Sequence, residues 1–348
     1  MKRSKILSLA TNVVSHLNPY VLAVFLYLLI YFIRFQQALP AGRQGGWEPK
    51  LDLFPEIRQN LDMRISELLP SPQAELLSGI LLGNKKDLPF DLKLALRDTS
   101  TLHIVVVSGQ NLTLLAGLFL SLSGILKRKT AIFMSIGAVI FYTILTGAQI
   151  PVIRAAIMAI LAFSAQLVGR QRDGVWILIV TGALMLLLNP LWITDLSFQL
   201  SFLATLGVIL IAPILESRLK FLPNFIRIDL AVTIGAQIMV IPIIAQYFHQ
   251  LSIVGVLANL LVGWTIPFIM ILGVLMILVG GVVVFLVNAL LTYFIYIVTF
   301  FSSLPFAWEY VGEKSLLVWI GYYMILAASL LLLNNDKRQD TQGFAKSS

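Results

Sequence analysis

The chain consists of apolar runs close to the length that crosses a bilayer, separated by short loops that carry much of the charge. A helix needs ~20 apolar residues to cross the hydrocarbon region, and the first such run is Tyr20–Leu39. Only 12% of the 348 residues are charged, against ~25% in soluble domains. Lipid cannot satisfy open sheet edges, so such runs fold as helices. The sequence predicts an all-α, polytopic integral membrane bundle.

Basic clusters set the expected orientation of the crossings. Lysine and arginine gather at residues 2–5, 127–129, 170–172, 218–227 and 337–338. Basic clusters in short loops mark the cytoplasmic side of a membrane. The apolar runs between them predict about ten spans in the inner membrane, with both termini cytoplasmic. Leu251–Val287 is too long for one span, which predicts a half-helix or re-entrant piece, Ile253–Val262, before a full span, Ile266–Val287.

Four parts are expected along the chain. They are a basic leader with the first transmembrane helix at 1–39, extracytoplasmic amphipathic helices at 40–100, the transmembrane bundle at 101–334 and a disordered cytoplasmic tail at 335–348. Between Leu51 and Leu82, leucine and isoleucine recur at helical spacing among charged residues. This pattern predicts a helix at the outer surface or on the bundle, followed by a second short helix over Gln73–Leu82.

Composition argues against several kinds of chemistry. The chain has no cysteine, hence no disulfide, thiol nucleophile or thiolate metal site. His16, His103 and His249 are far apart, and none belongs to an H-x-H or H-E-x-x-H pattern. No phosphate-binding loop of the G-x-x-x-x-G-K-[ST] type is present either. We expect no enzymatic activity, no metal and no cofactor, and an energy source outside this chain.

A polar group interrupts the apolar stretch Asp98–Gly117. Ser108, Gly109, Gln110 and Asn111 follow one another in its middle. Amides and a helix-weakening glycine at membrane depth are costly unless they face protein or a water-filled cavity. One interpretation is a transmembrane helix that uses these residues for packing. The other is a broken helix that lines a translocation path.

Arg154 is the ionisable residue that stands out within the predicted spans. It lies just after Pro151 in an apolar helix, where it either snorkels to the outer interface or faces the bundle interior. The nearest candidate partner is Asp195, which could equally act as a favourable charge at a helix N-terminus. Gln199 follows one turn deeper on the same face.

Two further amides, Gln237 and Asn259, lie in apolar segments that also contain Pro242 and Pro267. Proline usually kinks a span, so an amide beside each kink favours a hydrated interior. The predicted lining or gating residues are therefore Ser108, Gly109, Gln110, Asn111, Arg154, Asp195, Gln199, Gln237 and Asn259.

The segment His103–Leu112, H-I-V-V-V-S-G-Q-N-L, resembles the H-L-x-A-[VI]-S-G-x-[HN]-[VI] signature of the ComEC competence-protein family. Four more blocks follow the family pattern in order, at Leu81–Pro89, Thr146–Met158, Asn189–Ala204 and Ala236–Leu261. The family often has histidine where Asn111 stands, which puts in doubt any role there that needs a titratable group. Many members also carry an OB-like domain and a metallo-β-lactamase-like domain. Here only residues 40 to about 70 stand where the first would be, and no H-x-H-x-D-H is present, so we expect no nuclease activity.

The resemblance implies an inner-membrane channel that conducts single-stranded DNA into the cytoplasm during natural transformation. It also implies an external DNA receptor, a cytoplasmic helicase-like ATPase and, if one strand is degraded, a separate nuclease. The alternative is a small-solute or lipid-linked-precursor transporter that uses the same polar path. An intramembrane enzyme is less favoured because no nucleophile–base pair or metal set stands out.

Overall fold

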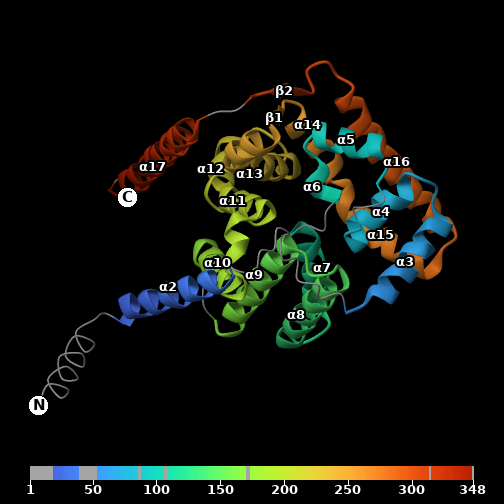
Figure 1. The fold of residues 1–348 in the computed structure, drawn as a ribbon, viewed down its shortest axis with the longest axis horizontal. Helices are drawn as coiled ribbons and strands as arrows, with labels where there is room; N and C mark the ends of the chain where they lie inside the picture. The colour runs from blue at the N-terminus through green and yellow to red at the C-terminus, as the bar shows by residue number, and fades with distance from the viewer. Residues whose placement is uncertain are drawn as a thin grey trace, which may run out of the picture.

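A computed structural model describes residues 19–38, 53–84, 88–105, 109–169, 173–312 and 315–346. Helices make up nearly all of this part of the chain (Figure 1), which confirms the predicted all-α class. The exception is one antiparallel ribbon of two strands, β1 (Gln250–Ser252) and β2 (Trp308–Tyr310).

The helices in chain order are α2 (Pro19–Ala38), α3 (Pro55–Leu68), α4 (Gln73–Leu82), α5 (Phe90–Asp98), α6 (Leu102–Val105), α7 (Gly109–Ser121), α8 (Arg128–Leu145), α9 (Ile150–Leu167), α10 (Gly174–Leu188), α11 (Leu196–Leu210), α12 (Ala212–Arg218), α13 (Asn224–Phe248), α14 (Gly255–Gly263), α15 (Thr265–Val279), α16 (Val282–Ser302) and α17 (Leu316–Lys346). Two short 3-10 turns join them, η2 (Leu122–Gly124) and η3 (Pro190–Thr194).

The prediction of about ten spans was wrong. By length and composition, the described residues contain 5 helices able to cross a membrane, namely α8, α9, α11 continued by α12, α13 and α16. A sixth span results if α14 and α15, which meet at a bend of 42°, are counted together. Helices α7 and α10 have only 13 and 15 residues. At 1.5 Å per residue they fall short of the ~30 Å hydrocarbon core.

Glycines explain the second difference from the predicted spans. The span expected over Ile266–Val287 ends at Val279, because Gly280 and Gly281 adopt positive φ angles of 67° and 63°. Left-handed backbone of this kind favours glycine, and α16 begins directly after the pair. The half-helix expected over Ile253–Val262 corresponds to α14. The predicted break between α14 and α15 is therefore present, whereas the end of the following helix lies at Val279 instead of Val287.

The core is built around α4. The sequence predicted the bounds of this helix but not its burial in the core. Leu76, Leu77 and Ile80 are completely buried, and α4 contacts α3, α6, α15 and α16. Gly273 of α15 lies so close that a Cβ there would be 2.9 Å from Leu77 Cδ1. Helix α4 is thus part of the core, whereas α3 is the amphipathic helix at the surface.

Helices α11 and α13 form the most extensive helix pair. A Cβ added to Gly207 would lie 2.1 Å from the carbonyl oxygen of Gly235. The two backbones therefore touch, as small residues allow in membrane bundles. This contact fixes α11 against the helix that carries Gln237.

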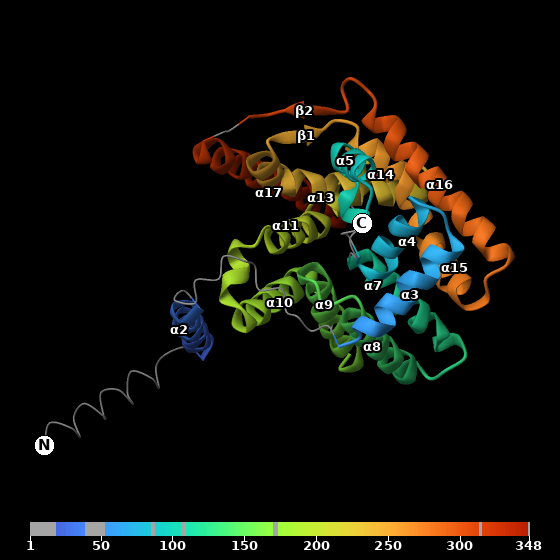
Figure 2. The ribbon, with the colours of Figure 1, turned by 45° about the vertical axis from the view of Figure 1, so that its right-hand side comes forward.

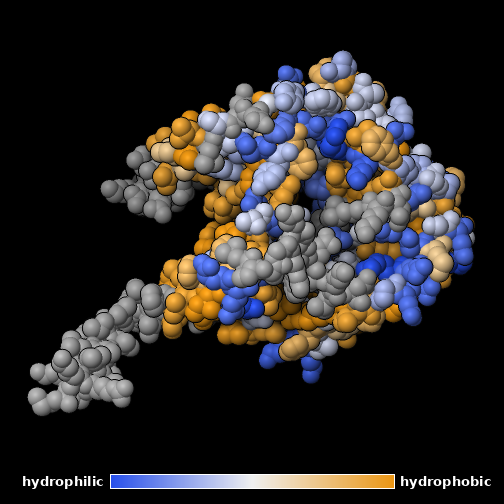
Figure 3. All heavy atoms as spheres, viewed as in Figure 1, coloured by the Kyte–Doolittle hydropathy of each residue, from blue (hydrophilic) through white to orange (hydrophobic). Residues whose placement is uncertain are grey.

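Large apolar side chains cover much of the surface. Figure 3 shows them over α10, α11 and α13, with hydrophilic side chains over α3. Trp176 of α10 and Phe285 of α16 are 65% and 73% exposed, as suits side chains that contact lipid. The chain is accordingly a membrane protein. Helix α17 lies alongside α13 (Figure 2) and continues through residues 335–346, where the sequence predicts disorder.

Candidate functional site

Three of the predicted polar residues, Gly109, Gln110 and Asn111, open α7. Helix α6 ends at Val105 and α7 begins at Gly109, while Ser108 lies outside the described residues. A Cβ on Gly109 would lie 3.0 Å from Nη2 of Arg154 and 3.3 Å from Cβ of Ala155. The first turn of α7 therefore sits directly on the guanidinium of α9, and glycine permits this approach.

Arg154 is buried, with only 9% of its surface exposed, so it does not snorkel to an interface. Its Nε donates to Ser201 Oγ at 2.5 Å, and its Nη1 donates to Thr205 Oγ1 and, at 3.5 Å, to Met158 Sδ. Within the described ranges, no carboxylate forms an ion pair with it. The bundle interior therefore holds a positive charge that two neutral hydroxyl groups position but do not neutralise.

One of these hydroxyl groups is itself fixed by α11. The Thr205 hydroxyl donates its proton to the Ser201 carbonyl at 2.9 Å, which leaves its oxygen free to accept from Arg154. Ser201 and Thr205 are four residues apart and share one face of the helix. Sequence reasoning missed both residues, and neither lies three or four residues from Asp195 or Gln199, so the helical spacing gave no signal for them.

Asp195 is not the partner of Arg154. Its Oδ1 accepts from the Phe198 backbone N–H at 3.0 Å and caps the start of α11. Of the two interpretations, the charge at a helix N-terminus is the one that the structure supports. Gln199 donates to the Ile193 carbonyl at 2.9 Å. Both side chains thus stabilise the turn that begins α11. That helix in turn carries Ser201, which contacts Arg154.

Asn111 forms a hydrogen bond to the C-terminal end of α4. It is 1% exposed, and its Nδ2 donates to the Ile80 carbonyl at 3.1 Å. The Tyr142 hydroxyl donates to the same carbonyl at 3.5 Å, and Gln149 Nε2 donates to the Gly83 carbonyl at 3.0 Å. The last carbonyls of a helix lack intrahelical donors. Asn111 therefore satisfies backbone groups and holds α4 against α7, while Gln110 beside it is exposed.

Gln237 and Asn259 differ from the other candidates because they have unused hydrogen-bonding capacity. Gln237 Oε1 and Asn259 Oδ1 are buried and accept no hydrogen bond within the described part of the chain. They belong to α13 and α14, which pack together. A buried acceptor without a donor costs ~1–3 kcal/mol, so these oxygens are the positions where water or a cargo donor would be stabilised.

Gly109 thus contacts Arg154 directly. Asp195 and Gln199 are connected to Arg154 only indirectly, through α11, whose start they stabilise. Gln237 is tied to α11 by the contact between Gly207 and Gly235. Across the described residues, no group of three or more histidine, aspartate or glutamate side chains is placed to hold a metal ion. The chemistry that this arrangement offers is attraction of an anion by a buried cation in a polar interior.

Residues 80–336 match the Competence protein family. The chain belongs to this family. Its relatives include ComE operon protein 3 of Bacillus subtilis (strain 168), 26% identical over 215 residues, which are 61% of this chain and 27% of the relative. Uncharacterized protein YcaI of Escherichia coli (strain K12) is 28% identical over 254 residues, 68% of this chain and 32% of the relative. An uncharacterized protein of Aquifex aeolicus (strain VF5) is 31% identical over 167 residues, 46% of this chain and 40% of the relative.

The family assignment confirms the resemblance drawn from the five sequence blocks. This competence-family chain covers less than half of the length of each of these relatives. No solved structure matches it. The matched region begins at Ile80 and includes Asn111, Arg154 and Ser201, so the contacts described above lie within the part that defines the family.

Proposed function

We propose that this competence-family protein takes part in DNA uptake and conducts single-stranded DNA through the inner membrane into the cytoplasm. The observation that carries this function is Arg154. It lies buried between α7 and α11, hydroxyl groups hold it in place, and no carboxylate in the described residues neutralises it. A cation of this kind attracts an anionic strand without reading its bases.

The chemistry of the guanidinium suits a phosphate backbone. Arginine binds phosphate through charge-assisted, often bidentate, hydrogen bonds. A series of such groups would bind a polyanion tightly and stop it, because a conducting path must also release what it admits. One buried arginine held by two neutral hydroxyl groups would give each passing phosphate a transient contact.

Several partners follow from this function. The chain is a conduit rather than an enzyme, so an external DNA receptor would deliver the strand and a cytoplasmic helicase-like ATPase would pull it in. A separate nuclease would remove the second strand if that strand is degraded. In this arrangement both termini of the chain are cytoplasmic.

A second candidate is a transporter of a small solute or a lipid-linked precursor. The buried amide oxygens of Gln237 and Asn259 favour it, because acceptors without donors suit a neutral cargo that carries hydroxyl groups. A neutral solute of this kind would have little need of Arg154, so it differs from DNA in its dependence on that charge.

Uptake of labelled single-stranded DNA into proteoliposomes that enclose a DNA-pulling ATPase tests this function. Protection of the label from added nuclease is expected with the wild type, reduced with Arg154→Lys and lost with Arg154→Gln. The matched control is Arg227→Gln, since Arg227 pairs with Glu216 at 3.5 Å near the start of α13. DNA with an uncharged methylphosphonate backbone should not be protected.

Two results would count against the function. Wild-type uptake by a folded Arg154→Gln variant would contradict the role of the charge. Failure of the folded wild type, with an active motor and a supplied receptor, would contradict DNA conduction itself.

A further inference from the structure

Helix α13 contains a proline whose missing hydrogen bond is replaced from another helix. Pro242 lies buried inside α13, and proline has no N–H to donate to the carbonyl four residues earlier. That carbonyl belongs to Ile238, and the Tyr322 hydroxyl of α17 donates to it at 2.8 Å. The Tyr323 hydroxyl donates to the next carbonyl, that of Met239, at 2.9 Å. Helix α17 therefore supplies the donor that Pro242 cannot.

A third contact lies on the other side of the proline. Trp319 Nε1 donates to Gln246 Oε1 at 2.9 Å. Trp319, Tyr322 and Tyr323 are spaced i, i+3 and i+4, which places them on one face of α17. We call these three side chains the α17 clasp. Their acceptors bracket Pro242 along α13.

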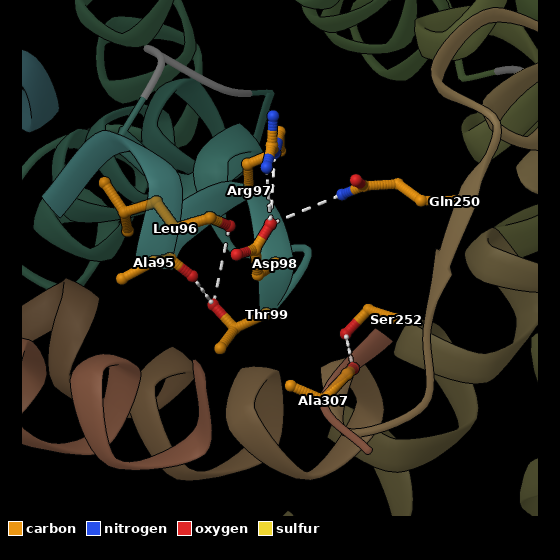
Figure 4. Close-up of polar contacts among 8 residues, drawn as sticks. All are labelled: Ala95, Leu96, Arg97, Asp98, Thr99, Gln250, Ser252 and Ala307. Carbon is orange, nitrogen blue, oxygen red and sulfur yellow. Dashed lines mark hydrogen bonds and ion pairs between the residues drawn. The ribbon is translucent and has the colours of Figure 1, made fainter. Parts of the chain in front are cut away.

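The strand ribbon links the same two helices. Strand β1 follows α13 and β2 precedes α17, and Gln250 lies opposite Tyr310 in their register. The Val311 N–H donates to the His249 carbonyl at 2.9 Å. The Ser252 hydroxyl donates to the Ala307 carbonyl at 3.2 Å (Figure 4). The part of α13 after Pro242 is thus attached to the chain that leads into α17.

The ribbon also contacts the turn between α5 and α6. Gln250 Nε2 donates to Asp98 Oδ1 at 3.5 Å, and Arg97 pairs with the same oxygen at 3.0 Å (Figure 4). A Cβ on Gly255 would lie 3.1 Å from Ser100 Cβ. The hydrogen bond from Gln250 is long and hence weak. This turn is followed by α6, so the ribbon contacts the part of the chain that precedes α7.

We propose that the α17 clasp and the β1–β2 ribbon form a strap that controls the α13 segment after Pro242. With the clasp closed, the ribbon rests on the α5–α6 turn. With the clasp released, α13 bends at Pro242 and the ribbon leaves that turn, which opens the path beside it. What passes through the opening rests on the DNA-conducting function proposed above, whereas the hinge itself is measured without DNA.

A double-mutant cycle tests the clasp. Tyr322→Phe removes one hydroxyl, and Pro242→Ala restores the N–H that makes this hydroxyl redundant. Val254 follows β1 and is 3% exposed, so a cysteine there is shielded while the clasp is closed. The chain has no native cysteine. The rate at which a water-soluble maleimide labels Val254→Cys in the purified full chain therefore reports opening. One hydrogen bond is worth about a 3- to 10-fold change in the opening equilibrium.

We expect Tyr322→Phe to raise the labelling rate by that factor when Pro242 is present and to have little effect with Pro242→Ala. The matched control is Tyr296→Phe, an exposed tyrosine of α16, which should change nothing in either background. Equal effects of Tyr322→Phe in both backgrounds would overturn the pairing of Tyr322 with Pro242.

A cross-link tests the opening. A short, reducible cross-link between Asp98→Cys and Gln250→Cys should abolish DNA uptake, and reduction should restore it. A cross-link between Leu251→Cys and Glu309→Cys, which are opposite residues of the ribbon, should leave uptake intact because the ribbon moves as a unit. Full uptake with the first pair cross-linked would overturn the strap. Absence of uptake by the wild type would instead contradict the proposed function and leave the labelling result as the measure of the hinge.

Discussion

The position of Arg154 depends on two hydroxyl groups, which can be removed one at a time. Thr205→Val keeps the shape of the side chain but leaves a buried guanidinium N–H without its acceptor, at an expected cost of ~1–3 kcal/mol. Ser201→Ala should have a similar cost, measured as thermal unfolding in detergent. Thr299→Val is the matched control, because that exposed hydroxyl donates within its own helix, to the carbonyls of Ile295 and Tyr296. Equal losses for Thr205→Val and Thr299→Val would contradict the role of Thr205.

Asn111 gives a second prediction for a single residue. Asn111→Leu removes the donor to the Ile80 carbonyl at the end of α4, which should lower the free energy of unfolding by ~1–3 kcal/mol. Gln110→Leu, at the exposed neighbouring position, is the control and should stay near neutral. Chemical denaturation in mixed detergent micelles compares the two. A change at Asn111 no larger than that at Gln110 would show that α4 is held by packing alone.

Sequence reasoning singled out Arg154 but left open whether it snorkels or faces the interior, and its candidate partner Asp195 instead caps α11. Asp195 offered the right charge, but a carboxylate directly before a helix satisfies that helix's own N–H groups first. Ser201 and Thr205 could not be assigned, because they meet Arg154 only through the packing of α9 on α11. Local hydrogen bonding can be predicted from the chain order, whereas a contact between two helices cannot.

At the scale of elements, the backbone contact between α11 and α13 is the most sensitive point. Gly207→Ala places a methyl group 2.1 Å from the Gly235 carbonyl oxygen, so the two helices must separate. We expect a loss of at least ~1–3 kcal/mol from overpacking and reduced uptake, read by thermal unfolding and by the proteoliposome assay. Gly137→Ala in α8, where nothing lies within 4 Å of the new Cβ, should instead be neutral or stabilising by ~0.5–1 kcal/mol. Similar behaviour of the two variants would contradict close packing of α11 on α13.

The hydrophobic pattern predicted some helix bounds correctly but not the burial of the helices. Gln73–Leu82 was predicted with its observed bounds, but an apolar helix suits the core and the lipid equally, so its burial could not be predicted. The break before α15 followed from run length, whereas the boundary at Gly280 and Gly281 was overlooked although both glycines are visible in the sequence. Span counting failed at α7 and α10, which have only 13 and 15 residues, because an apolar run does not show where its helix begins and ends.

At the scale of the whole molecule, charge and helix length disagree about the segment between residues 129 and 218. Both ends carry basic residues, which places both loops on the cytoplasmic side. The helices long enough to cross in this interval are α8, α9 and α11 with α12, and three crossings would put the loops on opposite sides. Helix α10 packs against α9 and α11 and continues into η3. We therefore expect the bilayer to thin locally, so that α10 completes a fourth crossing.

Single cysteines decide this topology in a chain that has none of its own. Gly124→Cys and Phe221→Cys replace exposed residues beside the two basic loops and leave every charge in place. A membrane-impermeant maleimide should label neither in intact cells and both after permeabilisation, since an even number of crossings returns the chain to the same side. Labelling of Phe221→Cys but not Gly124→Cys in intact cells would mean that α10 stays within one leaflet. The basic loop after α12 would then face outward, where positive charge near the membrane would favour capture of DNA rather than contact with a cytoplasmic motor.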